Sequence, residues 1–406
     1  MAAPEMTGPS GAANSDSSTT SASPDESYFQ DTEQPASQHW HKGEPILSVR
    51  DLHVSFKTDD GIVKAVDGVR YDVFPNEVLG IVGESGSGKS VTSLAIMGLL
   101  PKTATIEGEI LLRGQDLLKM SEEDRRKLRG LKIAMVFQDA LAALNPVFTV
   151  GSQIAEAIKV HHPDDSKHVV HSRVVELLDV VGIPNPEERA DQYPHEFSGG
   201  MRQRAMIAMS IANDPDVLIA DEPTTALDVT IQAQVLEVFE RIQERTSSAL
   251  VLITHDLGVV AGVADRVLVM YAGKPVEIGT VDQIFYAARH PYTLGLLASL
   301  PRLDIGEKTG RLYRIKGQPP SLINVPSGCS FHPRCEFAKT PDPCATDTPV
   351  MEECEKSPGH MAACHFKEQM AAVKVEELIP EVGAELDVVE DAAALDPSSA
   401  TPEGEL

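Results

Sequence analysis

The sequence predicts an α/β protein with a mainly parallel sheet, and three observations support this fold class. From about residue 46 to 285, short runs rich in β-branched residues alternate with segments of helical apolar spacing. A glycine-rich stretch, GESGSGKS at residues 83–90, follows a buried-strand run and precedes an apolar helix pattern. A further apolar run, VLIADE at residues 217–222, ends in two carboxylates.

Length and composition exclude several other classes of protein. At roughly 150 residues per domain, 406 residues indicate two to three domains, and a 42% hydrophobic fraction is enough for a real core. No apolar run approaches the ~18 residues that span a bilayer. The first residues lack the basic start and apolar core of a secretory signal. We therefore expect a cytoplasmic protein, or one on the cytoplasmic face of a membrane.

The charge distribution argues against nucleic acid as a partner. The formal charge is −26, from 61 acidic and 35 basic residues. Residues 1–42 carry six acidic residues against one lysine, and residues 375–406 carry ten against none. The remaining body is still acidic and would repel a phosphate backbone.

The elements follow in order from the N-terminus. Residues 1–43, rich in Ser, Thr, Ala, Pro and Gly, are expected to be disordered. Order begins near Ile46, where ILSVRDLHVSF is typical of an edge strand. Four strand–helix pairs follow: VLGIVG with SVTSLAIMGLL, IAMVFQ with VGSQIAEAIKV, VLIADE with TIQAQVLEVFERIQERT, and ALVLITH with DLGVVAGVAD. The third helix has a core-facing stripe made of Ile231, Val235, Val238 and Ile242.

Three segments complete the chain. Residues 286–328 are expected to form a proline-punctuated connector, and residues 329–366 a cysteine-rich module. Residues 367–406 are acidic and rich in alanine, and we expect them to form a disordered tail.

Residues 83–90 fit the phosphate-binding pattern G-x-x-x-x-G-K-[ST]. The glycines let backbone N–H groups turn toward phosphate oxygens, and the next helix adds its positive dipole end. Lys89 is predicted to bind the β- and γ-phosphates, and Ser90 to hold Mg²⁺. The loop residues predicted to bind nucleotide are Gly83, Glu84, Ser85, Gly86, Ser87, Gly88, Lys89, Ser90 and Val91.

The carboxylates after the VLIAD strand complete a site for ATP hydrolysis. Asp221 is predicted to hold Mg²⁺ through water, and Glu222 to orient or polarise the attacking water. Taken alone, these two residues could simply cap the next helix, but paired with the phosphate-binding loop they indicate an ATPase.

The stretch FSGGMRQR at residues 197–204 resembles the signature sequence of ABC-type ATPases, whose usual form is LSGGQ. Further motifs of that family occur in the same order: a Q-loop Gln138, a D-loop ALD ending in Asp228, and a switch His255. The resemblance implies an ABC-type nucleotide-binding domain at residues 44–285, of the P-loop NTPase class. It implies a mainly parallel core sheet, an antiparallel edge subdomain and a helical signature subdomain at about residues 140–212.

Membership of this family implies that two such domains pair head to tail, each holding ATP against the partner's signature. The residues that would face the partner's ATP are Ser198, Gly199, Gly200, Met201 and Gln203. The implied catalytic residues are Glu222, His255, Lys89 and Gln138, and the implied Mg²⁺ ligands are Ser90, Gln138 and Asp221. Met201 stands where the family more often has Gln. Phe56 is the candidate for stacking on adenine.

Three stretches resemble the ATPases of dipeptide, oligopeptide and nickel importers: residues 136–158, 290–303 and 328–365. The resemblance implies a motor for peptide uptake, peripheral on the cytoplasmic face of the inner membrane. Its implied partners are a second ABC ATPase subunit, two integral membrane permease subunits and an extracytoplasmic substrate-binding protein. Three alternatives remain: the same motor for nickel or another small solute, a soluble ABC ATPase without a transport role, and a regulator that binds ATP without turnover.

All five cysteines lie between Cys329 and Cys364, which favours a metal site over disulfides in a reducing compartment. Thiolates suit zinc and an iron–sulfur cluster equally, and the spacing does not choose between them. The importer family is similar in ending with four cysteines that hold a [4Fe–4S] cluster, with Zn²⁺ as the alternative. The matching residues are Cys329, Cys335, Cys344 and Cys364. Cys354 has no counterpart and is a possible substitute.

Overall fold

The computed structural model describes residues 43–139, 143–225, 227–300 and 313–378. The tail expected at residues 1–43 lies outside this part except for Gly43, as do residues 379–406 and Ala226 of the D-loop. The strands are β1 Leu47–Thr58, β2 Gly61–Val73, β3 Val78–Val82, β4 Ala104–Leu112, β5 Gln115–Asp116, β6 Ile133–Val136, β7 Val217–Asp221, β8 Ala249–Thr254, β9 Arg266–Tyr271, β10 Lys274–Thr280, β11 Glu352–Cys354 and β12 Ser357–Ala362.

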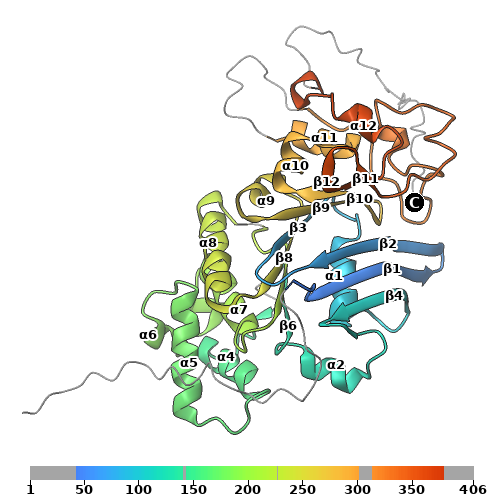
Figure 1. Ribbon diagram of the computed structural model, residues 1–406. Coiled ribbons are helices and arrows are strands. Elements are labelled where there is room, and N and C mark those ends of the chain that lie inside the picture. Colours follow the sequence, from blue (N-terminus) through green and yellow to red (C-terminus); the bar gives the residue numbers. More distant parts are fainter. Residues whose placement is uncertain (1–42, 140–142, 226, 301–312, 379–406) are drawn as a thin grey trace, which may run out of the picture. The chain divides into compact units, whose positions relative to one another are not determined.

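The helices are interspersed with these strands (Figure 1). They are α1 Lys89–Met97, α2 Glu122–Leu128, α4 Val150–Lys159, α5 Lys167–Val180, α6 Pro186–Ala190, α7 Gly199–Ser210, α8 Val229–Thr246, α9 Leu257–Val263, α10 Val281–Tyr286, α11 Pro291–Ala298 and α12 Lys367–Met370, with short 3-10 turns at Pro194–Glu196, His332–Arg334 and Val375–Leu378. Within the described residues, no helix is long and apolar enough to cross a membrane.

An eight-stranded sheet in the order β11-β12-β10-β9-β3-β8-β7-β6 forms the centre of the fold. The strands from β9 to β6 are parallel, whereas β10, β12 and β11 join by antiparallel pairing. Every residue of β3, β6, β7 and β8 is buried, as expected for parallel strands covered on both faces. The predicted α/β class with a mainly parallel core is therefore confirmed.

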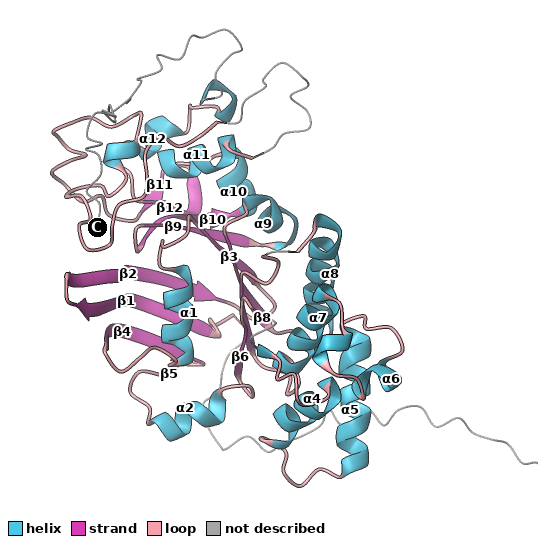
Figure 2. Cartoon of the chain, turned by 180° about the vertical axis from the view of Figure 1, so that it is seen from behind, coloured by secondary structure: helices cyan, strands magenta, loops and turns pink. Residues whose placement is uncertain are grey.

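A second sheet, in the order β2-β1-β4-β5, is antiparallel and corresponds to the expected edge subdomain. Helix α1 contacts both sheets, because its residues touch β1 and β2 as well as β6 and β7. In Figure 2 this sheet and helices α4 to α8 lie on opposite sides of the central strands. Helix α1 therefore fixes the end of the phosphate-binding loop between the two sheets.

Helices α4, α5, α6 and α7 form the predicted helical subdomain, and all lie within residues 140–212. Polar side chains begin three of the helices that carry the site: Ser166 caps α5, Ser198 caps α7 and Asp228 caps α8. The apolar stripe predicted on α8 faces the core as expected. Val235, Val238 and Ile242 are buried, and Ile231 packs partly buried against the same cluster.

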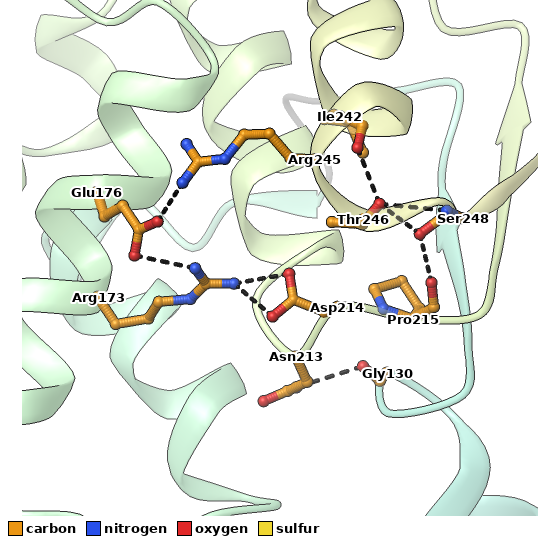
Figure 3. A network of polar contacts seen from close by, with 10 residues as sticks. All are labelled: Gly130, Arg173, Glu176, Asn213, Asp214, Pro215, Ile242, Arg245, Thr246 and Ser248. Atoms are coloured by element: carbon orange, nitrogen blue, oxygen red, sulfur yellow. Dashed lines mark hydrogen bonds and ion pairs between the residues drawn. The ribbon is translucent and has the colours of Figure 1, made fainter. Parts of the chain in front are cut away.

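A network of polar contacts ties this helical subdomain to the strand that carries Asp221 (Figure 3). Arg173 on α5 is buried and donates to both carboxylate oxygens of Asp214 at 2.8 Å. Glu176 accepts from Arg173 at 3.0 Å and from Arg245 on α8 at 2.5 Å. Because Asp214 lies three residues before the start of β7, the network anchors the start of the strand whose far end enters the nucleotide site.

The C-terminal region differs from the expected sequence of connector, separate module and tail. Strand β12 of the module pairs with β10, so the module extends the central sheet. The connector contains α11, in which Pro291 occupies the first helical turn and is therefore compatible with a helix. Residues 367–378 are ordered, because Met370 and Val375 are buried in a cluster with Tyr292 of α11. The prolines of the expected connector and the acidic charge of the expected tail gave no indication in the sequence that the two segments share a core.

Candidate functional site

The phosphate-binding loop joins the end of β3 to the start of α1. Gly83 and Gly88 have φ values of 155° and 98°. A Cβ atom would lie 2.2 Å from the carbonyl oxygen of Met270 at Gly83, and 2.4 Å from that of Ala65 at Gly88. Only glycine fits such a close approach of two backbones. The loop is thereby fixed against β2 and β9.

Lys89 is buried and its ammonium group lies inside the loop. Its Nζ donates to the carbonyl oxygens of Gly83 at 2.7 Å and Glu84 at 3.0 Å. Burial lowers the pKa of Lys89, while the carboxylates of Glu222, Asp221 and Glu84 oppose that shift. The arrangement holds one cation where phosphate oxygens would meet the loop.

Two of the three residues predicted to hold Mg²⁺, Ser90 and Asp221, lie within hydrogen-bond distance of each other. Ser90 Oγ donates to Asp221 Oδ1 at 3.0 Å. Burial raises the pKa of Asp221, and the neighbouring charge of Glu222 acts in the same direction. A hydroxyl and a carboxylate oxygen at this distance are hard donors of the kind that Mg²⁺ prefers.

Three side chains converge on one oxygen of Glu222. Its Oε2 accepts from Thr225 Oγ1 at 2.9 Å and from Gln138 Nε2 at 3.2 Å, and it lies 3.3 Å from His255 Nδ1. Glu222 also has a positive φ of 48°, which costs a non-glycine residue about 1 to 3 kcal/mol. The backbone N–H of Glu222 donates to the carbonyl of Ile253 at 2.9 Å and holds this conformation. The sequence reasoning missed Thr225, whose place three residues after Glu222 in the same turn was the available signal.

A pocket of about 680 Å³ opens over the loop. Its lining comprises Ala65, residues 84–91, Gln138, Glu222, His255, Leu296 and Leu322. Phe56, the candidate for adenine stacking, does not belong to this lining. It lies on β1, paired with Val63 and Ala104 in the antiparallel sheet. Apolar surface comes from Leu296 and Leu322 of the expected connector. The importer-like stretch at residues 290–303 contains Leu296 but did not predict that it lines the pocket.

The signature residues lie outside that pocket, at the start of α7. Ser198 Oγ accepts from the N–H of Met201 at 3.3 Å and so caps the helix. Gly200 is buried, and a Cβ atom there would lie 2.6 Å from Ile231 Cγ2. A Cβ atom at Gly199 would meet nothing within 4 Å. Ser198 and Gly199 therefore form an exposed helix start that lies outside the pocket over the phosphate-binding loop.

The other signature residues, Met201 and Gln203, and the D-loop residue Asp228 differ from Ser198 and Gly199 in exposure or contacts. Gln203 is buried, because the helical period turns position 203 inward with Gly200. Its side chain therefore does not extend toward a partner. Met201 packs partly buried against the main core. Asp228 is exposed, and its carboxylate caps α8 by accepting from Ile231 N–H at 2.9 Å.

Four cysteines line one small cavity in the C-terminal region: Cys329, Cys335, Cys344 and Cys364. Burial raises the pKa of the Cys335 and Cys364 thiols to about 12, and nearby cysteines add to the shift. Cys354 lies outside this lining, at the end of β11, although it is also buried. No group of three or more His, Cys, Asp or Glu among the described residues has the spacing of a site for one metal ion.

Comparison with known proteins agrees with this arrangement. The family model "ABC transporter" matches residues 66–225, and "Oligopeptide/dipeptide transporter, C-terminal region" matches residues 276–344. The dipeptide transport ATP-binding protein DppD of Bacillus subtilis (strain 168) is 52% identical over 330 residues, which cover 81% of this chain and 96% of that protein. The oligopeptide transport ATP-binding protein OppD of the same organism is 55% identical over 296 residues, or 72% and 82% of the two chains.

A solved structure shares the fold. The dimeric structure of MJ0796, a bacterial ABC transporter cassette, has a TM-score of 0.52 and 25% sequence identity. The match covers 58% of this chain and 98% of that one.

Proposed function

The chain belongs to the ATP-binding proteins of oligopeptide and dipeptide ABC importers, and on this premise we propose how its residues drive peptide uptake. It is an ABC ATPase and the motor subunit of such an importer. The observation that carries the proposal is the 52% identity over 96% of a dipeptide transport ATP-binding protein. The convergence of Lys89, Glu222 and His255 on one pocket supports it.

The described contacts support specific roles in ATP hydrolysis. Backbone N–H groups of the loop and Lys89, whose ammonium lies inside the loop, would bind the phosphates. Ser90 and Asp221 would hold Mg²⁺, which would neutralise charge on the phosphates. Glu222 orients the attacking water and takes its proton. The water oxygen bonds to the γ-phosphorus as the bond to the bridging β-phosphate oxygen breaks, which releases ADP and phosphate. Thr225, Gln138 and His255 hold Glu222 in position.

The exposed start of α7 supports a two-chain site. Helix N-termini with free N–H groups bind phosphate, and Ser198 and Gly199 are exposed and lie outside the pocket over the phosphate-binding loop of the same chain. A second ABC ATPase subunit would supply the nucleotide that they bind, and the related MJ0796 cassette is dimeric.

Exposed apolar side chains support docking onto membrane subunits. Phe137, next to Gln138, is 42% exposed, and Val147 and Phe148 nearby in sequence are 73% and 55% exposed. Two permease subunits and an extracytoplasmic binding protein would complete the importer, with this chain peripheral on the cytoplasmic face. Gln138 directly follows Phe137 in the chain and donates to Glu222 Oε2 at 3.2 Å, so movement of the permease at Phe137 would reach the catalytic carboxylate.

Peptide uptake tests this function. The chain, its partner ATPase, the permeases and the binding protein, reconstituted in proteoliposomes, are expected to accumulate labelled di- or oligopeptides only when ATP is present on the motor side. Nickel ions serve as the competing cargo, and a complex with Lys89→Ala is the inactive control. ATP-driven accumulation of nickel without peptide would exclude peptide as the cargo.

We propose that the four-cysteine cavity holds a [4Fe–4S] cluster rather than zinc. Three imidazoles also line it, and one nitrogen of each has a partner: His290 Nδ1 accepts from the Tyr292 N–H at 3.1 Å, His332 Nδ1 lies 2.9 Å from the Cys329 carbonyl, and His365 Nε2 lies 2.9 Å from that of Asp347. The sulfur donors in this lining are Cys329, Cys335, Cys344 and Cys364, with Pro291, Phe331, Phe337, Phe366 and Met370 as apolar neighbours. One zinc ion needs all its sulfurs about 2.3 Å away, whereas the described residues contain no single-ion grouping. Cys329, Cys335, Cys344 and Cys364 would hold the cluster, which supplies a structural cross-link.

The metal content of two matched variants checks this assignment. Anaerobically purified protein is expected to be brown and to contain about four irons per chain. Cys335→Ala should lose most of the iron, whereas Cys354→Ala should retain it because Cys354 lies outside the cavity. Colourless protein with stoichiometric zinc, or iron loss in Cys354→Ala alone, would contradict the assignment.

A further inference from the structure

An arginine from the cysteine module binds the side chain of a residue in the phosphate-binding loop. Arg334 donates to Glu84 Oε2 at 2.6 Å and to Glu84 Oε1 at 3.0 Å, across 250 residues of sequence. Glu84 is the second residue of the loop, and Arg334 directly precedes Cys335. The pair is bidentate, the strongest geometry for an arginine and a carboxylate.

Arg334 is held rigidly from several sides. Its side chain is only 6% exposed, and its Nε donates to the carbonyl of Lys316 at 3.0 Å. The guanidinium carbon lies 5.7 Å from the ring centre of Tyr271 and 5.9 Å from that of Phe331. A buried guanidinium is costly without its counter-charge, so Glu84 and Arg334 depend on each other.

Glu84 links Arg334 to the groups of the loop that would bind phosphate. Its backbone N–H donates to Tyr292 Oη at 2.9 Å, and its carbonyl accepts from Lys89 Nζ at 3.0 Å. Side chain, N–H and carbonyl of this one residue therefore have three different partners. Displacing the side chain would shift both the loop backbone and the ammonium group of Lys89.

The backbone of Arg334 belongs to the turn between two cavity-lining cysteines. The N–H of His332 donates to the Cys329 carbonyl at 3.0 Å, and the N–H of Cys335 donates to the His332 carbonyl at 3.3 Å. The N–H of Arg334 donates to the Phe331 carbonyl at 2.9 Å. An ordered cysteine site therefore fixes the point from which Arg334 reaches the loop.

We propose that Arg334 is a positioning residue that couples the cysteine module to the phosphate-binding loop through Glu84. The inference rests on the proposed binding of ATP at this loop. The module holds the loop in the shape that accepts phosphate, so breaking the pair weakens nucleotide binding. Arg334 touches none of the reacting atoms and acts only through Glu84.

A double-mutant cycle on MgATP affinity tests the coupling. The purified full chain is prepared unchanged and as Arg334→Gln, Glu84→Gln and the double variant, and its dissociation constant for MgATP is measured by titration calorimetry. Each single variant is expected to bind about tenfold more weakly, and the double variant no more weakly than the weaker single one. In the assembled complex the KM for ATP should rise more than kcat falls, and the iron content of Arg334→Gln should match that of the unchanged chain.

The controls separate this inference from the proposed function. Lys89→Ala reports on the nucleotide site itself, and Lys367→Gln breaks the 2.8 Å pair with Glu352 at the surface of the same module and should leave affinity unchanged. Wild-type affinity in Arg334→Gln alongside a defective Lys89→Ala would refute the coupling and leave the ATP site standing. Fully additive losses would also refute it. Should Arg334→Gln not fold, the near-isosteric Glu84→Gln decides alone, and unchanged MgATP affinity there would overturn the proposal.

Discussion

Replacing Glu222 with glutamine is expected to lower ATP turnover of the assembled importer by at least ~10²-fold, in line with the loss of a general base. The amide oxygen of glutamine can still accept from Thr225 and Gln138, so the local geometry remains. What disappears is a group able to take the proton of the attacking water. ATP binding should be retained, because Lys89 and the loop amides are unchanged. Phosphate release by the complex and MgATP titration measure the two effects.

A matched control for this variant is Glu240→Gln, an exposed carboxylate on α8. It removes the same charge from the surface away from the pocket and should leave turnover unchanged. Unaltered turnover in Glu222→Gln would assign the base to another group, and loss of MgATP binding would show that Glu222 belongs to the binding surface instead.

Much of this site could be predicted from sequence because its residues belong to local patterns. Gly83 to Ser90 form one continuous loop between a strand and a helix, so their geometry follows from neighbours in the chain. Asp221 ends the buried strand β7 and Glu222 follows it, and parallel neighbours bring that end of β7 beside β3 through β8. His255 follows β8 in the same way. Backbone topology alone was sufficient to bring these residues together.

The contributions of the C-terminal region could not be predicted in this way. Leu322 and Arg334 reach the site through tertiary packing, and the importer-like stretch at residues 328–365 did not indicate this position for Arg334. The pairing of β12 with β10 converts an apparent separate module into part of the central sheet. Phe56, predicted to stack on adenine, lies on β1 and is not among the residues that line the pocket. The pattern of a strand predicts which of its side chains lie on the same face of the sheet. It does not predict which distant segment of the chain covers the pocket.

The signature glycines provide a prediction that depends on a second chain. Gly199→Asp is expected to lower turnover of the assembled complex by at least ~10²-fold, because it places a carboxylate where the partner's γ-phosphate would meet the start of α7. The substitution should not disturb the chain itself, since a Cβ atom at Gly199 meets nothing within 4 Å. MgATP affinity of the isolated chain and its thermal unfolding should therefore stay unchanged, while ATP-dependent association with the partner ATPase, measured by light scattering, is lost.

Gly262→Asp is the matched control for this variant, because Gly262 is also an exposed helical glycine whose Cβ would meet nothing within 4 Å. It adds the same charge on α9, away from the signature, and should leave turnover and association unchanged. Equal losses in both variants would mean that added negative charge, and not the signature position, weakens the complex. Full turnover in Gly199→Asp would exclude a role for this helix start in binding the partner's nucleotide. A lower MgATP affinity of the isolated chain would show that the glycine serves its own site.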